Sequence, residues 1–186
     1  MKFSSAELPG VVIIEPVVYE DERGWFMESF NQQRFEEGLH SLGQPIPSTF
    51  VQDNQSCSKK GVIRGLHYQS EPFAQGKLVS VAQGAAFDVV VDIRLDSSTF
   101  GQWFGTELSA INKKMLWIPA GFAHGFLALE DGTHFSYKTT RFYNRDSENS
   151  LLWNDPAIGV KWPKLDGYII SNKDRAAPML SDIEVM

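Results

Sequence analysis

The sequence predicts an all-β protein, either a β-sandwich or a jelly-roll β-barrel, with a few short helices. Many short segments alternate apolar and polar residues with a period of two, which is the pattern of strands. Gly or Pro turns separate many of these segments. Only one early segment has a convincing helical pattern, and many short strands in one chain favour two packed sheets or a closed barrel.

The strands follow one another along most of the chain. The first is rich in Val and Ile, and Pro16 restricts part of it to the edge of a sheet. The alternation is clearest at residues 87–94, where it predicts a half-buried strand with its aspartates on the polar face. The expected strands are residues 11–19, 25–30, 50–56, 62–68, 77–82, 87–94, 103–108, 115–118, 126–129 and 135–140.

Three other segments are expected to be helical or irregular. Asn31 can cap a helix over residues 32–39. Residues 151–163 contain Trp and Pro and are expected to form a loop region that covers an end of the barrel. Residues 170–186 are expected to form short helical turns. No repeat or linker interrupts the chain, so residues 1–186 are expected to form a single domain.

The charge and the cysteine count limit the classes of partner. The net charge of −6 disfavours nucleic-acid binding, so any anionic ligand must be held by a few local cations. The single cysteine, Cys57, cannot form an internal disulfide, which favours a reducing cytoplasm. We expect no secretion signal and no membrane span, because the first ten residues lack an apolar region and no run of about 18 apolar residues occurs.

The most informative feature is a pair of histidines beside turn glycines in strand-like segments. His67 lies in residues 64–69 (RGLHYQ) and His124 in residues 119–125 (PAGFAHG). His67 is close in sequence to the cations Arg64 and Lys77, and a histidine beside fixed positive charge can act as a base on an anionic substrate. For any single histidine a structural role at a strand end is the more common one.

The histidine pattern argues against a metal site. Besides His67 and His124 the chain has only His40 and His134, and it contains neither an H-x-H nor an H-E-x-x-H motif. Cations near His67 would also repel a divalent ion. The phosphate-binding Walker loop, the dinucleotide glycine fingerprint and the nucleophile-elbow serine are absent as well. We therefore expect no metal and no cofactor.

An ordered set of motifs resembles one known family. The P-x-G-x-x-H run at residues 119–124 is similar to the second motif of cupin jelly-roll barrels, whose metal-binding first motif is absent. The chain further resembles the dTDP-4-dehydrorhamnose 3,5-epimerase family, the metal-free branch of that class. The matching stretches are DERGWFMESF (21–30), FVQDNQS (50–56), GVIRGLHYQ (61–69), QGKLVSV (75–81), FDVVVDIR (87–94), STFGQW (98–103), LWIPAGFAHGFLAL (116–129), YKTT (137–140), WNDP (153–156) and SNKD (171–174).

The resemblance implies an isomerase that acts on a thymidine-diphosphate 4-keto-6-deoxyhexose. Removing a proton next to the ketone gives an enolate, and returning a proton to the opposite face inverts the carbon, with no redox cofactor or metal. By resemblance His67 is the base, Asp174 orients its imidazole, Tyr137 is the acid and Lys77 stabilises the enolate oxygen. From sequence alone Asp174 is a helix cap or surface acid, Tyr137 a packed ring and Lys77 a solvated strand-end lysine.

The resemblance also implies ligand contacts. Guanidinium and ammonium groups suit phosphate, and aromatic rings suit thymine or ribose. Gln52 and Asn54, two residues apart on a strand, share one face. The implied substrate-binding residues are Arg23, Phe26, Glu28, Gln52, Asn54, Arg64, His124, Tyr143, Glu148 and Lys173.

Arg64 and His67 have opposite parity in a strand, so a regular strand would point them to opposite faces. Either Gly65 forms a bulge that changes the count, or the two side chains contact different parts of a long ligand. The family resemblance also implies a homodimer with exchanged N-terminal strands, in which Arg23, Phe26 or Glu28 serves the neighbouring subunit.

Three alternative functions remain at this stage. The nearest is a relative that inverts only C3 or C5, or a ketoisomerase acting on the same nucleotide sugar. The second is a non-catalytic module that binds a sugar nucleotide or carbohydrate. The third is a metal-dependent cupin oxygenase.

Overall fold

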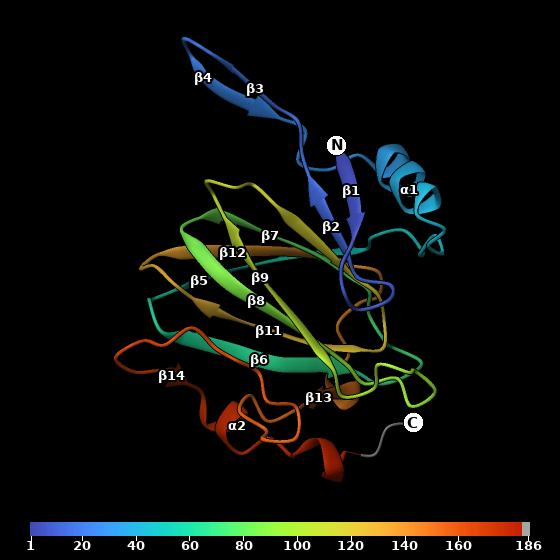
Figure 1. Cartoon of the computed structure of the whole chain (residues 1–186), viewed down its shortest axis with the longest axis vertical. Helices are drawn as coiled ribbons and strands as arrows, with labels where there is room; N and C mark the ends of the chain where they lie inside the picture. Colours follow the sequence, from blue (N-terminus) through green and yellow to red (C-terminus); the bar gives the residue numbers. More distant parts are fainter. Residues whose placement is uncertain (184–186) are drawn as a thin grey trace.

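The computed structural model describes residues 1–183, and its body consists of two β-sheets that face one another (Figure 1). The first sheet has the strand order β1-β2-β10-β7-β12-β5. Its strands are β1 (Lys2–Ser5), β2 (Val12–Glu15), β10 (Met115–Ile118), β7 (Lys77–Gln83), β12 (Thr133–Thr139) and β5 (Gln52–Ser58). Every pair of neighbours in this sheet is antiparallel.

The second sheet has the order β13-β6-β11-β8-β9, and a short strand, β14, runs parallel to β6. Its strands are β13 (Glu148–Ser150), β6 (Val62–Gln69), β11 (Phe122–Ala128), β8 (Ala85–Asp92), β9 (Trp103–Ser109) and β14 (Ile169–Ile170). Two such sheets packed face to face form the predicted jelly roll, so the predicted fold class is confirmed.

The inner apolar faces of the two sheets form the main core. Phe126 of β11 stacks on Phe135 of β12 with ring centroids 4.0 Å apart and planes 5° from parallel. Val79 and Val81 of the first sheet meet Val90 of the second in the same cluster. Val79 and Val81 belong to the apolar set of an alternating strand, whereas Val90 shares its face of β8 with Asp88 and Asp92. Fully burying a side chain of this kind contributes about 1.5–3 kcal/mol.

Helix α1 (Gln32–Ser41) covers part of the outer face of the first sheet. Asn31 caps it as predicted, because its side-chain oxygen accepts the backbone N–H of Arg34 at 3.1 Å. Phe35 and Leu39, four residues apart, lie on one side of the helix and are buried in a cluster that includes Trp117. The helix is two residues longer than predicted.

The C-terminal segments cover the outer face of the second sheet. Leu151, Ile158 and Trp162 belong to the same buried cluster as Val89 and Val91. The prediction that residues 151–163 cover an end of the barrel was therefore wrong, and so was the prediction of a half-buried strand at residues 87–94. Seven of the eight residues of β8 are buried, because this loop region covers one face while the inner core covers the other.

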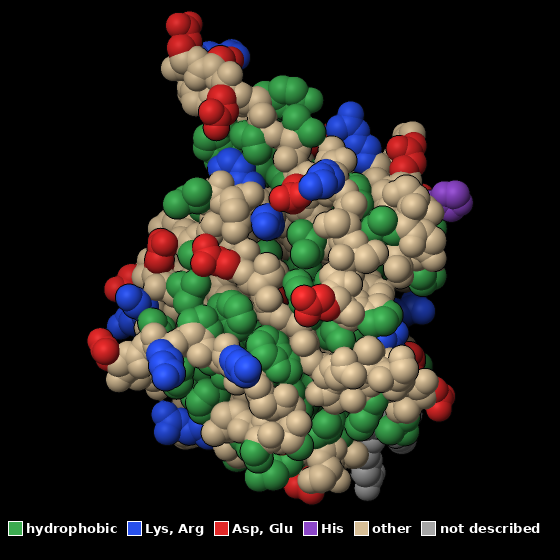
Figure 2. Space-filling view, viewed as in Figure 1, with side chains coloured by type: hydrophobic (Ala, Val, Ile, Leu, Met, Phe, Trp, Pro, Cys, Tyr) green, Lys and Arg blue, Asp and Glu red, His purple; other side chains and the backbone are tan. Residues whose placement is uncertain are grey.

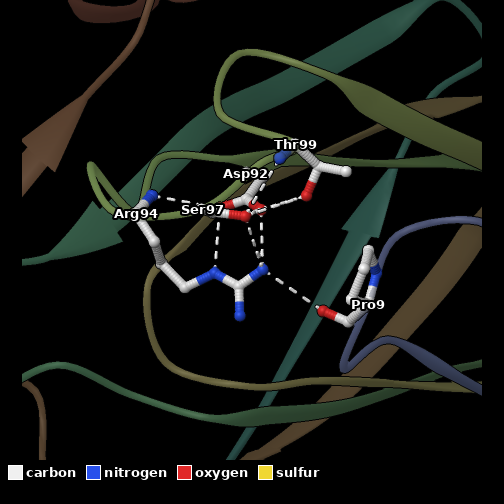
Figure 3. A network of polar contacts seen from close by, with 5 residues as sticks. All are labelled: Pro9, Asp92, Arg94, Ser97 and Thr99. Carbon is white, nitrogen blue, oxygen red and sulfur yellow. Dashed lines mark hydrogen bonds and ion pairs between the residues drawn. The ribbon is translucent and has the colours of Figure 1, made fainter.

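A network of polar contacts fixes the chain after β8 (Figure 3). The carboxylate of Asp92, which has no exposed surface, accepts hydrogen bonds from the Arg94 backbone and guanidinium at 2.6–3.0 Å. It also accepts the hydroxyls of Ser97 and Thr99, each at 2.6 Å. Arg94 Nη2 donates further to the carbonyl of Pro9 at 3.3 Å. The network thus ties the loop after β8 to the N-terminal segment.

A hairpin of β3 (Val18–Asp21) and β4 (Gly24–Met27) projects from the body (Figure 1). We call residues 18–27 the arm. Tyr19, Trp25 and Phe26 of the arm are 61%, 57% and 69% exposed. The Lys113 ammonium lies 3.8 Å from the centroid of the Trp25 ring, which is the geometry of a cation–π contact.

The prediction of one strand at residues 11–19 was wrong, because the segment is interrupted around Pro16 and forms β2 and β3, which belong to different sheets. The remaining differences from the predicted elements concern short strands and strand ends. Strand β11 begins at Phe122, four residues earlier than predicted, so His124 lies inside a strand. Strands β1, β13 and β14 were not predicted, since they are short. The C-terminal turns are α2 (Asn172–Arg175) and a 3-10 turn (Leu180–Asp182), while residues 184–186 of the predicted turns lie outside the described residues.

The described residues include no helix that is both long enough and apolar enough to span a membrane. On the face drawn in Figure 2, Lys and Arg side chains are scattered among acidic and apolar ones and do not form one continuous basic surface.

Candidate active site

A cleft of about 670 Å³ opens between the two sheets. One wall comes from β6 and β11 of the second sheet and the other from β7 and β12 of the first, while the stacked rings of Phe126 and Phe135 also line it. Most of the predicted site residues line this cleft, namely Arg64, His67, Lys77, His124, Tyr137, Tyr143, Glu148, Lys173 and Asp174.

His67 and Asp174 form a close pair although 107 positions separate them. The helical turn α2 holds Asp174, which is 4% exposed, and Ser171 caps that turn by accepting the Asp174 backbone N–H at 3.0 Å. His67 Nε2–H donates to Asp174 Oδ1 at 2.7 Å, and the backbone N–H of Gly65 donates to Oδ2 at 3.4 Å.

The surroundings of Asp174 keep it ionised. Burial by itself raises its pKa, but hydrogen bonds from His67 and Gly65 and the charge of His67 hold the pKa of this carboxyl below its usual range. An ionised carboxylate only accepts hydrogen bonds, so it selects the imidazole tautomer with the proton on Nε2. The Nδ1 atom of His67 makes no hydrogen bond within residues 1–183, so its lone pair is available to accept a proton in the cleft.

A bulge at Gly65 brings Arg64 and His67 into the same cleft. His67 pairs with His124 across β6 and β11, and Arg64 pairs with Phe126, so two residues of β6 oppose the single residue Gly125. Gly65 has φ of +126°, and a Cβ atom there would lie 2.6 Å from the Cα of Gly125. The bulge alternative is therefore confirmed.

Tyr137 and Lys77 come from the opposite wall. In the β12–β7 pairing Thr139 lies opposite Lys77, so Tyr137, two residues earlier, is on the same face. The Lys77 ammonium reaches across the cleft and donates to the carbonyl of His67 at 3.3 Å. A histidine–carboxylate pair thus faces a phenol and an ammonium across the cleft.

The two groups on this wall have shifted pKa values. Burial, opposed by Arg64 and assisted by Glu148, raises the pKa of Tyr137, which therefore keeps its proton. Burial lowers the pKa of Lys77 to about 8, while the negative charges of Asp88 and Glu148 oppose that fall. Lys77 is therefore still largely protonated at pH 7.

Glu148 links Lys173 and Tyr143 at the mouth of the cleft. Its Oε2 atom lies 2.6 Å from Lys173 Nζ and accepts the Tyr143 hydroxyl at 3.1 Å. Burial raises the pKa of Glu148, but the hydrogen bonds and charge of Lys173, with smaller contributions from Tyr143 and His67, hold it below its usual range. The Tyr143 ring is 53% exposed, so one of its faces can stack on a planar ligand.

Gln52 and Asn54 lie beside the cleft without lining it. Gln52 Oε1 accepts the backbone N–H of Tyr143 at 2.9 Å, and Gln52 Nε2 donates to Asn54 Oδ1 at 2.9 Å. The strand thus supports the segment that carries Tyr143.

The three N-terminal candidates are away from this cleft. Arg23 lies in the turn of the arm and pairs with Asp21 at 2.6 Å, and Phe26 is on the exposed β4. Glu28 directly follows β4 and pairs with Arg34 at 3.1 Å. Figure 1 shows the arm pointing away from the body, so none of the three reaches the cleft of its own chain.

Sequence reasoning missed a second histidine–aspartate pair. His124 Nε2 lies 2.7 Å from Oδ1 of Asp88, and Asp88 has no exposed surface. The alternation at residues 87–94 indicated that the aspartates share a face, but it assigned that face to solvent. The signal would have been an aspartate between Phe87 and Val89, in a strand whose other residues are mostly apolar on both faces.

Among the described residues no group of three or more His, Cys, Asp or Glu side chains is arranged to hold a metal ion. With a base and a proton donor on opposite walls and cations at the mouth, the fold and the cleft define an acid–base isomerase on a cupin-like jelly roll.

Comparisons with known proteins specify the family. The family model described as dTDP-4-dehydrorhamnose 3,5-epimerase matches residues 5–182, and the chain belongs to this family. A curated dTDP-4-dehydrorhamnose 3,5-epimerase from Salmonella typhimurium is 57% identical over 173 residues, which cover 93% of this chain and 92% of the relative.

Solved structures agree with this assignment. A dTDP-6-deoxy-D-glucose-3,5-epimerase from Legionella pneumophila, in complex with dTDP-4-keto-L-rhamnose, superposes with a TM-score of 0.92 at 50% identity and covers 98% of this chain and 94% of its own. A 3′-monoepimerase from Streptomyces bikiniensis, in complex with dTDP-quinovose, superposes with a TM-score of 0.86 at 32% identity over 95% and 86% of the two chains.

Proposed function

We propose that this chain inverts C3 and C5 of dTDP-4-dehydro-6-deoxy-D-glucose and so forms dTDP-4-dehydro-L-rhamnose. The observation that carries the proposal is the placement of a base and an acid on opposite walls of one cleft. His67, oriented by Asp174, comes from the second sheet, and Tyr137 comes from the first. Inversion needs this arrangement, because the proton leaves from one face of the sugar and returns to the other.

Each inversion proceeds in two steps that move only protons. His67 Nδ1 removes the proton from the carbon next to the C4 ketone, and the bonding electrons move onto the ketone oxygen to give an enolate. The Lys77 ammonium stabilises this oxygen. Tyr137 then donates its proton to the opposite face of the carbon, and the ketone forms again. The route therefore calls for no redox cofactor and no metal ion.

Both groups must be reset before the second carbon reacts. His67 then carries one extra proton and Tyr137 lacks one. The side chain of His67 is 32% exposed, so it can release its proton to water. The positive charge of Arg64, which lowers the pKa of Tyr137, stabilises the phenolate until it is protonated again.

The mouth of the cleft suits the nucleotide. Arg64 and Lys173 supply positive charge for the diphosphate, and the exposed ring of Tyr143 can stack on thymine. In this arrangement His124 contacts the sugar or the diphosphate, and Glu148 fixes both Lys173 and Tyr143. Gln52 and Asn54 act through the segment that carries Tyr143.

The proposal is tested with dTDP-4-keto-6-deoxyglucose in D₂O, followed by NMR. The expected result is deuterium at both C3 and C5 together with inverted product. Deuterium at one carbon only would replace the proposal with a single-carbon epimerase, the activity named for the Streptomyces bikiniensis relative. No exchange at either carbon, with the nucleotide sugar still bound, would favour a binding module.

We further propose a homodimer in which the arm completes the neighbouring subunit's cleft. Support comes from Arg23, Phe26 and Glu28, which the resemblance assigns to substrate and which lie away from their own cleft. The exposed aromatic side chains of the arm suit burial against a second copy. A cytoplasmic location is also a proposal, supported by the single free cysteine, Cys57.

Mixed dimers test the exchange of arms. Arg23→Ala alters the arm and His67→Asn alters the cleft. In a mixed dimer the unaltered cleft of the Arg23→Ala subunit receives the unaltered arm of the His67→Asn subunit, so one of the two sites is intact. Unfolding and refolding an equimolar mixture of the two variants should restore about a quarter of the wild-type activity. Light scattering that shows a stable monomer, or no gain of activity in the mixture, would contradict the proposal.

A further inference from the structure

Asp88 is a buried acid that the mechanism so far does not use. It lies on the inner face of β8, has no exposed surface and makes one side-chain hydrogen bond, from His124 to its Oδ1. Its Oδ2 atom is buried and has no hydrogen-bond partner within residues 1–183. A buried carboxylate oxygen without a partner is costly, so a functional reason for it is expected.

Lys77 is the cation whose charge Asp88 affects. Burial lowers the pKa of Lys77 to about 8, and Asp88 is the larger of the two negative charges that oppose this. The other, Glu148, is paired with Lys173 at 2.6 Å, so much of its charge is already compensated. Asp88 and Lys77 form no direct ion pair within the described part of the chain, and Asp88 therefore acts through the low-dielectric interior.

The other ionisable groups around Lys77 do not take over this role. The positive charges of Arg64 and Lys173 disfavour its protonation, and the remaining carboxylates, Glu148 and Asp174, are already paired. These groups are Arg64 and His67 on β6, His124 on β11, Tyr137 on β12, Tyr143 and Glu148 at the mouth, and Lys173 and Asp174 on α2.

We propose that Asp88, held in place by His124, is a positioning residue whose buried negative charge keeps Lys77 protonated for the enolate step. Within residues 1–183 its Oδ2 has no hydrogen-bond partner, so no donor besides His124 offsets that charge. The inference rests on the proposed function of Lys77, and it adds a residue that acts on the reaction through another side chain.

Asp88→Asn tests the charge with little change in shape. The amide oxygen can still accept the His124 N–H, so mainly the charge is lost. In the wild type, kcat/KM should fall as the pH rises through about 8, because Lys77 loses its proton there. In Asp88→Asn this alkaline limb should move to lower pH by about one unit.

Asp92→Asn is the matched control. Asp92 is also fully buried on the same face of β8, but hydrogen bonds satisfy both of its oxygens. This variant should unfold at a lower temperature and keep the wild-type alkaline limb. An Asp88→Asn enzyme whose activity falls equally at every pH would overturn the proposal.

A second measurement does not depend on activity. The chain with ¹³C-labelled lysine is titrated by NMR, and the Lys77 signal is assigned with Lys77→Arg. A Lys77 midpoint near 8 is expected, and a midpoint below 7 would contradict the proposal because the charge would then be absent. The same titration of Asp88→Asn should give a Lys77 midpoint about one unit lower, and equal midpoints in the two chains would overturn the proposal. If the wild type lacks epimerase activity, the proposed function fails while this comparison still tests the influence of Asp88.

Discussion

Two histidine–aspartate pairs lie at the cleft, each with its histidine in the lining, and they share a geometry but differ in their surroundings. The histidines are cross-strand neighbours, and in both pairs Nε2 lies 2.7 Å from Oδ1. The side chain of His67 is 32% exposed, whereas that of His124 is 9% exposed. Asp174 has Gly65 as a second donor, whereas the second oxygen of Asp88 has none among residues 1–183.

The difference in exposure separates their roles. The pair of His67 and Asp174 can exchange a proton with water after each step, which a base needs. The pair of His124 and Asp88 is closed off, so it contributes a fixed hydrogen bond and a fixed charge. The length of the hydrogen bond alone does not distinguish the two.

Asp174→Asn should have the largest effect on catalysis. The amide can present a donor to His67 and so favour the wrong tautomer, which should lower kcat about a thousandfold. Binding of dTDP, measured by calorimetry, should change little, because the cations at the mouth remain. If kcat falls less than tenfold, the proposed catalytic role of the His67–Asp174 pair, which distinguishes it from the His124–Asp88 pair, is contradicted.

Gly65→Ala should destabilise the protein by about 3 kcal/mol and displace His67 from His124. The new methyl group would meet the Gly125 backbone at 2.6 Å, on a residue with φ of +126°. Urea unfolding measures the loss. Gly43→Ala is the control, since its φ is +67° and nothing lies within 4 Å, and it should cost about 1 kcal/mol. Equal losses of unfolding free energy in the two variants would show that the close contact between Gly65 and Gly125 does not contribute to stability.

Tyr137→Phe should lower the rate of epimerisation about a hundredfold and leave the base in place. His67 would still remove the proton and return it to the same face, so deuterium from D₂O should enter the substrate faster than inverted product forms. NMR follows both rates in one sample. Equal loss of exchange and inversion would assign the acid to another group.

The reference for a purely structural carboxylate is Asp92. Burial raises its pKa, but hydrogen bonds from Arg94, Ser97 and Thr99 lower it to about 2. A depressed pKa stabilises the fold above the unfolded value of about 4, and this contribution is lost as the pH falls through about 2. The difference in unfolding free energy between wild type and Asp92→Asn should therefore shrink by about 2 kcal/mol between pH 5 and pH 2. A constant difference across this range would contradict the account of Asp92.

Local patterns in the sequence were sufficient to predict most of the strands and helix α1, but they could not predict which residues meet in the site. Alternation predicted most strands, and the Asn31 cap predicted α1, because these signals depend on neighbouring residues. The contact between His67 and Asp174 joins positions 107 residues apart, and only the family resemblance pointed to it. Alternation showed that Asp88 and Asp92 share a face, but in a strand buried on both sides it could not show that this face lies inside.

The most direct test of the account compares His67→Asn with His124→Asn at saturating dTDP-4-keto-6-deoxyglucose in D₂O. If His67 is the base for both carbons, His67→Asn abolishes deuterium entry at C3 and C5, while His124→Asn retains entry at both and needs more substrate for saturation. Retained exchange in His67→Asn together with its loss in His124→Asn would reverse the two roles and contradict the account.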